Sequence, residues 1–155
     1  MDILLTAAGF LMALVAGVFL SFSDFVMRGL VLARDGGGAA GMVGLNRTVY
    51  RSVFMALLIG FVPGSVLLSL AAMTVLDGAA TLWTLAGTGA YLAGVMAVTG
   101  LGNVPMNQRL DRLSDAGGAA GYWPAYARRW TRLNHVRTLA SGLAATAWLT
   151  AGSLA

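Results

Sequence analysis

Four long stretches of the chain carry no charged side chain, and short charged segments separate them. These stretches are Ile3–Ser23, Ser52–Leu76, Gly78–Gln108 and Thr138–Ala155. An α-helix rises about 1.5 Å per residue, so roughly 20 residues cross a hydrocarbon core of about 30 Å. The pattern therefore predicts an all-α integral membrane protein. Residues 1–155 are expected to form one domain, a four-helix bundle with spans at about 3–27, 52–76, 79–103 and 136–155.

Composition supports this class. Of the 155 residues, 58% are hydrophobic and only 10% are charged, against about 25% charged residues in an average soluble domain. A soluble globule needs more surface charge, and a disordered chain has fewer apolar residues. The absence of cysteine excludes disulfides, thiolate metal sites and cysteine nucleophiles.

The arginines are distributed unevenly between the connections. All ten basic residues are Arg, and they occur after the first and third apolar stretches but not at the termini or around Asp77. Basic residues favour the cytoplasmic side of a membrane. Both long loops are thus expected in the cytoplasm and both termini outside, in a bacterial inner membrane. This topology accounts for the net charge of +4 without a nucleic-acid partner. Met1–Asp2 lacks a basic n-region, so the first stretch is expected to be an uncleaved span.

The two halves of the sequence resemble each other. A Gly/Ala-rich run follows the first and the third stretch, at Asp35–Gly41 and Asp115–Gly121, and each run precedes a Leu-Asn pair, at 45–46 and 133–134. This favours two parallel helix–loop–helix repeats; recurrence through composition alone is the alternative.

Small residues recur every four positions within the predicted spans. Such stripes allow close helix packing, and they comprise Gly9, Ala13, Gly17 and Ser21; Gly60 and Gly64, on either side of Pro63; Ala86, Ala90 and Gly94; and Ala140 and Ala144. A short amphipathic cytoplasmic helix is also predicted over Tyr122–Arg137, with one aromatic face. That helix would either lie on the membrane surface or cap the mouth of the bundle.

Several polar residues near the ends of the spans are candidates for chemistry. Asp24 either pairs with Arg28, one helical turn on, or acts as an acid or base in a pocket. Asn103 and Asn107 lie four residues apart, on one helix face. Their amides either satisfy backbone groups freed by Pro105 or hold a ligand oxygen.

His135 is the only histidine in the chain. One histidine without cysteine or glutamate makes a poor metal site, so no metal is expected. The residue either makes an ordinary polar contact or acts as a general base, a role for which imidazole is well suited near neutral pH.

Several of these segments together resemble the anthrone oxygenase family, a group of small four-helix membrane proteins, many of unknown function. The resemblance rests on Phe22–Met27, Leu45-Asn46, the Asn-x-Pro-x-Asn motif at 103–107, and Trp130 with Asn134–Thr138. Members from polyketide pathways oxidise anthrones to anthraquinones with O₂ and no known cofactor. The resemblance implies an anthrone-oxygenase-like protein, a cofactor-independent monooxygenase acting on a hydrophobic phenolic, anthrone-like or quinone-like substrate.

Such a reaction needs a base, donors for an anionic oxygen and an apolar cavity. His135 or Asp24 is the expected base, and the expected substrate-binding residues are Asn103, Asn107, Asn134, Arg137, Trp130 and Trp123. These side chains should line one cavity at the cytoplasmic ends of the spans, with no cofactor. The expected partners are membrane lipid and a polycyclic or quinone-like molecule, and a homo-oligomer remains open. The alternative function is non-enzymatic: a lipid or quinone binder, or a subunit of a larger membrane complex.

Overall fold

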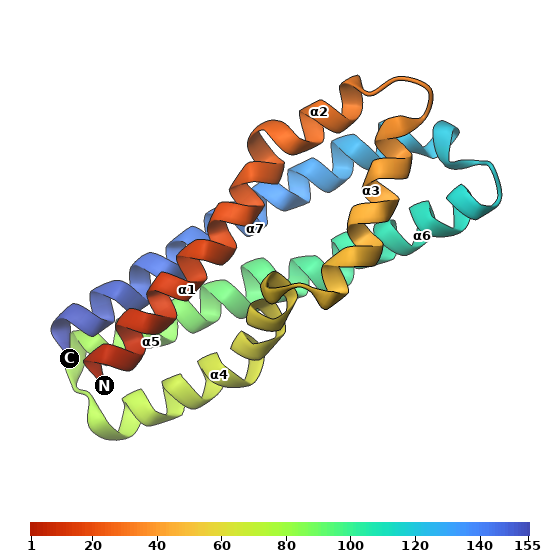
Figure 1. Cartoon of the computed structure of the whole chain (residues 1–155). Helices are drawn as coiled ribbons and strands as arrows, with labels where there is room; N and C mark the ends of the chain where they lie inside the picture. Colours follow the sequence, from red (N-terminus) through yellow and green to blue (C-terminus); the bar gives the residue numbers. More distant parts are fainter.

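The computed structural model describes residues 1–155, and all of its regular structure is helical (Figure 1). Three segments, η1, η3 and η4, are π-helical and η2 is a 3₁₀ turn. In chain order the elements are α1 (Asp2–Ser21), η1 (Phe22–Val26), α2 (Met27–Leu32), α3 (Gly37–Thr48), η2 (Val49–Arg51), α4 (Val53–Val75), α5 (Gly78–Gly89), η3 (Ala90–Ala97), η4 (Thr99–Asn103), α6 (Val104–Asp115) and α7 (Ala119–Leu154). The predicted all-α class is confirmed.

Three helical runs are long and apolar enough to cross a membrane. They are Asp2–Leu32, Val53–Val75 and Gly78–Asp115. The fourth span predicted from the sequence, at about 136–155, is the second half of α7. This half is less apolar because it is rich in Ala, Ser, Thr and Gly. Many of these small residues are buried inside the bundle, where close packing with neighbouring helices replaces contact with lipid.

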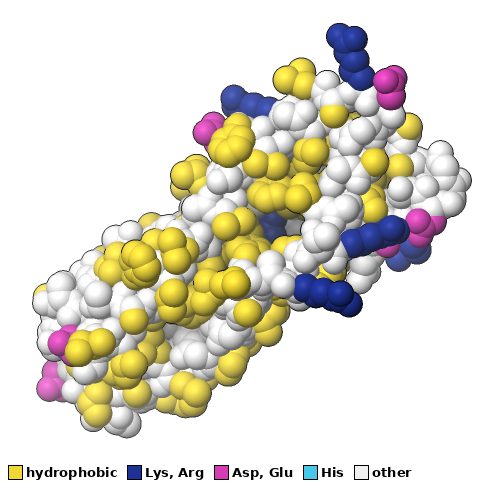
Figure 2. Space-filling view, viewed as in Figure 1, with side chains coloured by type: hydrophobic (Ala, Val, Ile, Leu, Met, Phe, Trp, Pro, Cys, Tyr) yellow, Lys and Arg dark blue, Asp and Glu magenta, His cyan; other side chains and the backbone are white.

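The bundle has two tiers, each with its own apolar core. One tier contains α1, α4, α5, η3 and the second half of α7, with both chain termini at its far end (Figure 1). The other contains α2, α3, α6 and the first half of α7. Figure 2 shows the arginine side chains gathered on this second tier. The membrane tier and the charged tier are therefore distinct along the bundle axis.

Two turns with left-handed backbone reverse the chain at the outer end of the charged tier. Asp35 and Gly36 have φ angles of 54° and 77°, and Gly117 has a φ of 75°. Glycine adopts this conformation without strain, and aspartate tolerates it better than most residues. Both turns fall within the two Gly/Ala-rich runs noted in the sequence. The similarity between the halves therefore extends to their connections.

The two halves differ in the helix that follows each turn. After α3 the chain breaks, and the Ser52 hydroxyl caps the new helix α4 by accepting a hydrogen bond from the Met55 amide at 3.1 Å. In the second half, α7 continues unbroken from Ala119 to Leu154. The predicted separate helix over Tyr122–Arg137 is thus the first half of α7. Its buried residues pack against α3 and α6.

Glycines allow close helix contacts at several of the predicted positions. Gly9 faces Ala145 and Leu149, and Gly94 faces Ala140. The prediction fails at Gly60 and Gly64, where nothing lies close enough to contact an added Cβ. These two glycines instead line an apolar groove of about 610 Å³ between α1 and α4. Helix α4 therefore lies less tightly against α1 than its small residues would allow.

The contrast between these glycines predicts opposite effects of adding one methyl group. Gly94→Ala would place a Cβ against the Cβ of Ala140, and overpacking of this kind costs about 1–3 kcal/mol. Gly60→Ala meets open space and gains helix propensity, so its stability should be unchanged or up to about 1 kcal/mol higher. Thermal unfolding of both variants in the same detergent measures the difference. Equal melting temperatures would contradict the packing described here.

Candidate functional site

Arg137 is the only buried residue among the arginines and aspartates, with 6% of its surface exposed. No carboxylate pairs with it, since the ion pairs of the structure involve only Met1 with Asp2, and Arg47 with Asp111 and Asp115. A buried charge is costly unless a partner compensates it. The charge of Arg137 is thus held by neutral groups alone.

Those groups are two polar side chains and two aromatic rings. Nη2 of Arg137 donates a hydrogen bond to Oδ1 of Asn134 at 2.7 Å, and Nη1 donates to Oγ1 of Thr99 at 3.4 Å. The guanidinium carbon lies 4.6 Å from the ring centre of Phe19 and 5.0 Å from that of Trp130. Cation–π contacts of this kind compensate part of the desolvation cost. The buried Nε–H has no partner, so the guanidinium keeps one unused donor.

Asn134 connects Arg137 to the end of α1. Its Nδ2 donates to the backbone carbonyl of Phe19 at 2.7 Å and to the Ser23 hydroxyl at 2.8 Å. These two bonds fix the amide, so that its oxygen faces Arg137. Ser23 lies in η1 and Thr99 lies in η4. π-Helical turns of this kind are frequent at functional sites, and here they supply two groups of the Arg137 network.

The two asparagines of the Asn-x-Pro-x-Asn motif bond across to α7. Oδ1 of Asn107 accepts hydrogen bonds from the Tyr126 hydroxyl at 2.8 Å and from Nε1 of Trp130 at 3.0 Å. Nδ2 of Asn103 donates to the backbone carbonyl of Trp130 at 3.4 Å, while its buried Oδ1 has no partner. The amides therefore hold Trp130 in place, rather than satisfying backbone groups freed by Pro105.

A cavity of about 380 Å³ lies next to this network, between α1, α3, α4 and α7. Phe19, Phe22 and Trp130 form its aromatic side, and the rings of Phe22 and Trp130 lie 5.5 Å apart. Asn46 also lines it and donates to the Tyr126 hydroxyl at a long 3.5 Å. Phe19 and Trp130 thus stand between the cavity and the guanidinium of Arg137, which contacts both rings.

The structure brings five of the predicted substrate-binding residues into one network: Asn103, Asn107, Trp130, Asn134 and Arg137. The expectation that all four polar residues line one open cavity requires a correction. They are packed behind Phe19 and Trp130, and only Trp130 of this set borders the 380 Å³ cavity. The sixth residue, Trp123, stacks on Tyr126 in the charged tier.

The two predicted bases lie outside this network. Asp24 is exposed and forms no ion pair with Arg28, so the predicted helical pair is absent. Its setting in η1, where the helix is wider than an α-helix, changes the register between the two side chains. His135 is also exposed and borders a different cavity, of about 780 Å³, between α2 and α7.

Tyr126, Thr99 and Ser23 belong to the network although their residue types did not single them out. Tyr126 lies one helical turn before Trp130 on α7, so helical spacing places it on the correct face. Thr99 and Ser23 lie in π-helical segments, where α-helical spacing gives no such signal. Tyr126 lies in the charged tier, and burial raises its pKa. Its hydroxyl therefore stays protonated at neutral pH and donates to Asn107.

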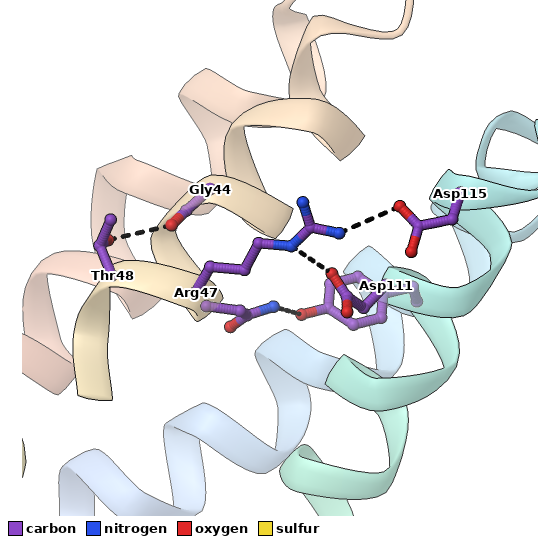
Figure 3. Close-up of polar contacts among 7 residues, drawn as sticks. Gly44, Arg47, Thr48, Asp111 and Asp115 are labelled. Carbon is purple, nitrogen blue, oxygen red and sulfur yellow. Dashed lines mark hydrogen bonds and ion pairs between the residues drawn. The ribbon is translucent and has the colours of Figure 1, made fainter. Parts of the chain in front are cut away.

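An exposed ion-pair cluster holds α3 against α6 beside this site (Figure 3). Nε of Arg47 donates to Asp111 at 2.8 Å, and its Nη2 donates to Asp115 at 3.1 Å. The hydrogen bonds that Arg47 donates to these carboxylates raise its pKa. Asn46 precedes Arg47 on α3, so the same helix that carries this anchor also presents Asn46 to the cavity.

The network predicts that Asn134 contributes more to stability than Asn46. Asn134→Ala removes three hydrogen bonds, leaving Arg137 with one fewer partner, and should cost about 2–3 kcal/mol. Asn46→Ala removes one long bond from a partly exposed side chain and should cost less than about 1 kcal/mol. Unfolding of both variants in the same detergent tests this order. A reversed order would show that the Arg137 network does not stabilise the junction of the tiers.

A family model described as anthrone oxygenase matches residues 45–147, about two thirds of the chain. The matched segment contains Asn103, Asn107, Trp130, Asn134 and Arg137, whereas Phe19 and Ser23 precede it. No curated protein and no solved structure matches the chain. The match confirms the resemblance seen in the sequence motifs, and the chain belongs to the anthrone oxygenase family.

Proposed function

We propose that this protein oxidises a hydrophobic, phenolic or anthrone-like substrate with O₂, without a cofactor, and that Arg137 stabilises the anionic form of that substrate. The observation that carries the proposal is the buried Arg137 guanidinium, which has no carboxylate partner and retains an unbonded Nε–H. A site that holds a positive charge without a counter-ion favours an anionic ligand. Membership of the anthrone oxygenase family supports this class of reaction.

The chemistry requires only a stabilised carbanion and O₂. An anthrone has a CH₂ group conjugated to an aromatic ketone, and loss of one C–H proton gives an anion whose charge is centred on the ketone oxygen. The anion transfers electrons to O₂ and forms a carbon-bound peroxide anion, which takes up a proton from solvent to give the hydroperoxide. Loss of the second C–H proton with cleavage of the O–O bond gives the quinone carbonyl and one water. The carbon is oxidised by four electrons, and O₂ accepts all four.

The aromatic cavity suits a planar ring system. Its volume of about 380 Å³ lies within the range of sites that bind small molecules, about 300–1,000 Å³. Phe22 and Trp130 would contact the faces of a polycycle through offset or tilted stacking. A rotation of the Phe19 or Trp130 ring would then bring the substrate oxygen to the guanidinium of Arg137, which both rings contact.

The proposal assigns Arg137, rather than a neighbouring base, the larger share of catalysis. His135 and Asp24 are exposed and do not border the aromatic cavity, so the substrate proton passes to solvent at the cavity mouth. Acid–base catalysis by a positioned side chain is worth about 10²–10⁴-fold in rate. His135→Gln and Asp24→Asn variants that retain most of the activity would agree with this assignment, and a loss of that size in either would restore the base predicted from the sequence.

A non-enzymatic role as a binder of lipid or quinone is the second candidate. The apolar groove of about 610 Å³ between α1 and α4 favours it, because a hydrocarbon chain fits between the lining residues. Such a binder would hold a hydrophobic molecule without consuming O₂. Oxygen uptake in the presence of substrate therefore separates the two functions.

The first expected outcome concerns turnover. Purified protein should accelerate oxidation of 1,8-dihydroxyanthrone, with one O₂ consumed per quinone formed. Arg137→Met should lower kcat/KM by about 10²–10³-fold, the usual cost of losing one oxyanion donor. Arg129→Met is the matched control, since Arg129 is an exposed arginine of the same helix, and its kcat/KM should remain within about twofold of the wild type.

Each variant is compared by size-exclusion profile and melting temperature before assay. Arg137→Lys keeps the positive charge and should retain more activity than Arg137→Met if charge stabilisation is the cause. Wild-type protein that leaves the rate of oxidation unchanged would contradict the oxygenase function. Equal activity of Arg137→Met and Arg129→Met would contradict the role of Arg137.

The second expected outcome concerns topology. We propose that both termini face outside and that the arginine-rich tier is cytoplasmic, because positive residues are retained on that side of a bacterial inner membrane. Both termini lie at the same end of the molecule, opposite the turns at Gly36 and Gly117 (Figure 1). A periplasmic reporter fused after Ala155 should be active, and a cytoplasmic reporter should be inactive. The reverse pattern would invert the proposed orientation.

A further inference from the structure

A second large cavity, of about 780 Å³, lies between α2 and α7 in the charged tier. It is separate from the aromatic cavity, which is lined by α1, α3, α4 and Trp130. Its lining includes Arg28, Arg128, Arg132 and His135, and it includes no aspartate. We call this cavity and its lining residues the basic groove. Its charge is therefore positive and uncompensated.

The arginines of the basic groove are unpaired, as are several other exposed arginines, and they differ from those others in lining one common cavity. Arg47 pairs with two aspartates, and Arg109 lies 4.5 Å from the ring centre of Tyr122. Arg28, Arg128 and Arg132 form no ion pair, hydrogen bond or cation–π contact in the structure. Three unpaired cationic side chains thus line one groove.

Helical spacing explains why the donors converge. Arg128, Arg132 and His135 occupy positions i, i+4 and i+7 of α7, which share one face of a helix. Arg28 faces them from α2. A ligand anion between the two helices would be reached from both sides.

The other side of the basic groove is apolar. Met27, Val31, Leu32 and Trp123 contribute to its lining, and the side chains of Val31 and Leu32 are 53% and 81% exposed. A small soluble anion would satisfy the arginines but would leave this apolar surface in water. An amphiphile with an anionic head and hydrocarbon chains would cover both.

The groove also lies at the level where lipid headgroups are expected. Arg28 follows the charge-free stretch Ile3–Ser23 by five residues, and His135 precedes the stretch Thr138–Ala155 by three. Arg28 and His135 are therefore expected close to the border between the hydrocarbon core and the cytoplasm. Basic pockets between helices at this depth bind anionic lipid headgroups.

We propose that the basic groove binds an anionic phospholipid of the cytoplasmic leaflet, with its phosphate between Arg28, Arg128 and Arg132 and an acyl chain along Val31 and Leu32. The site is independent of the oxidation proposed above, because it uses a different cavity and different residues. Its role would be to hold α2 against α7 through a ligand, since these helices share no ion pair of their own.

Trp123 provides the probe for a binding experiment, because it is the one tryptophan that lines this groove. Protein in a neutral detergent is titrated with phosphatidylglycerol carrying brominated acyl chains, which quench tryptophan fluorescence on contact. Parallel titrations use brominated phosphatidylcholine, which has no net charge. The quenching that disappears in Trp123→Phe is the signal from the basic groove.

We expect phosphatidylglycerol to saturate this signal at a concentration roughly 100-fold lower than phosphatidylcholine does. Each of the three arginines is expected to contribute about fivefold to this difference in affinity. Arg128→Gln with Arg132→Gln should raise that concentration about 25-fold, and Arg28→Gln alone should raise it about fivefold. The matched control is Arg112→Gln with Arg129→Gln, which removes the same charge from exposed positions outside the groove and should change it less than twofold.

Three results would overturn the proposal. Equal saturation by the two lipids would show that the groove does not select an anionic headgroup. An equal rise of the saturating phosphatidylglycerol concentration in the two double variants would show that the overall charge, rather than the groove, attracts the lipid. Displacement of phosphatidylglycerol by millimolar inorganic phosphate would assign the groove to a soluble anion. Because Arg28 lies on α2, the Arg28→Gln variant still tests the proposal if the α7 variants fail to fold.

Discussion

Arg137 and Asn134, which are hydrogen-bonded to each other on α7, lie where the two tiers of this bundle meet. Asn134 bonds to α1 through the carbonyl of Phe19, and Arg137 bonds to η4 through Thr99. The rings that contact the guanidinium belong one to each core, Phe19 to the membrane tier and Trp130 to the charged tier. Because the Arg137 guanidinium is buried without a carboxylate partner, it lowers the stability of the fold and favours an anion at this position. The aromatic cavity lies at the same level of the bundle.

Five of the arginines occupy three different settings. Arg47 pairs with aspartates and fixes α3 on α6, Arg137 is buried and faces the aromatic site, and those of the basic groove are exposed and unpaired. Overall charge and the positive-inside pattern describe them as one group. Only burial and pairing distinguish them, and these depend on tertiary contacts between segments far apart in the sequence.

Much of the fold could be predicted because membrane helices leave a long, simple signal. The run of apolar residues gave α4 within one residue of its observed bounds, predicted at 52–76 and found at Val53–Val75. The wider turns η1, η3 and η4 have no comparable signal, since a π-helical segment uses the same residue types as an α-helix. The groove beside Gly60 and Gly64 was also missed, because small residues permit close packing without enforcing it.

The candidate site could be predicted in part for a similar reason. Polar residues at helical spacing near span ends identified Asn103, Asn107 and Asn134 together with Arg137, since burying such groups requires partners. Local sequence could not show that His135 points to another cavity, because this depends on the packing of α2 against α7. Nor could it show that Tyr126 completes the bonding of Asn107.

The central claim is that Arg137 stabilises a bound anion, and it can be measured without turnover. The absorption spectrum of 1,8-dihydroxyanthrone reports its ionisation, and removal of O₂ prevents its oxidation. Titrated with pH under nitrogen, the ligand bound to wild-type protein should ionise at a lower pH than the free ligand, and Arg137→Met should remove that difference. Ionisation at the same pH in the free, wild-type-bound and variant-bound ligand would contradict the account.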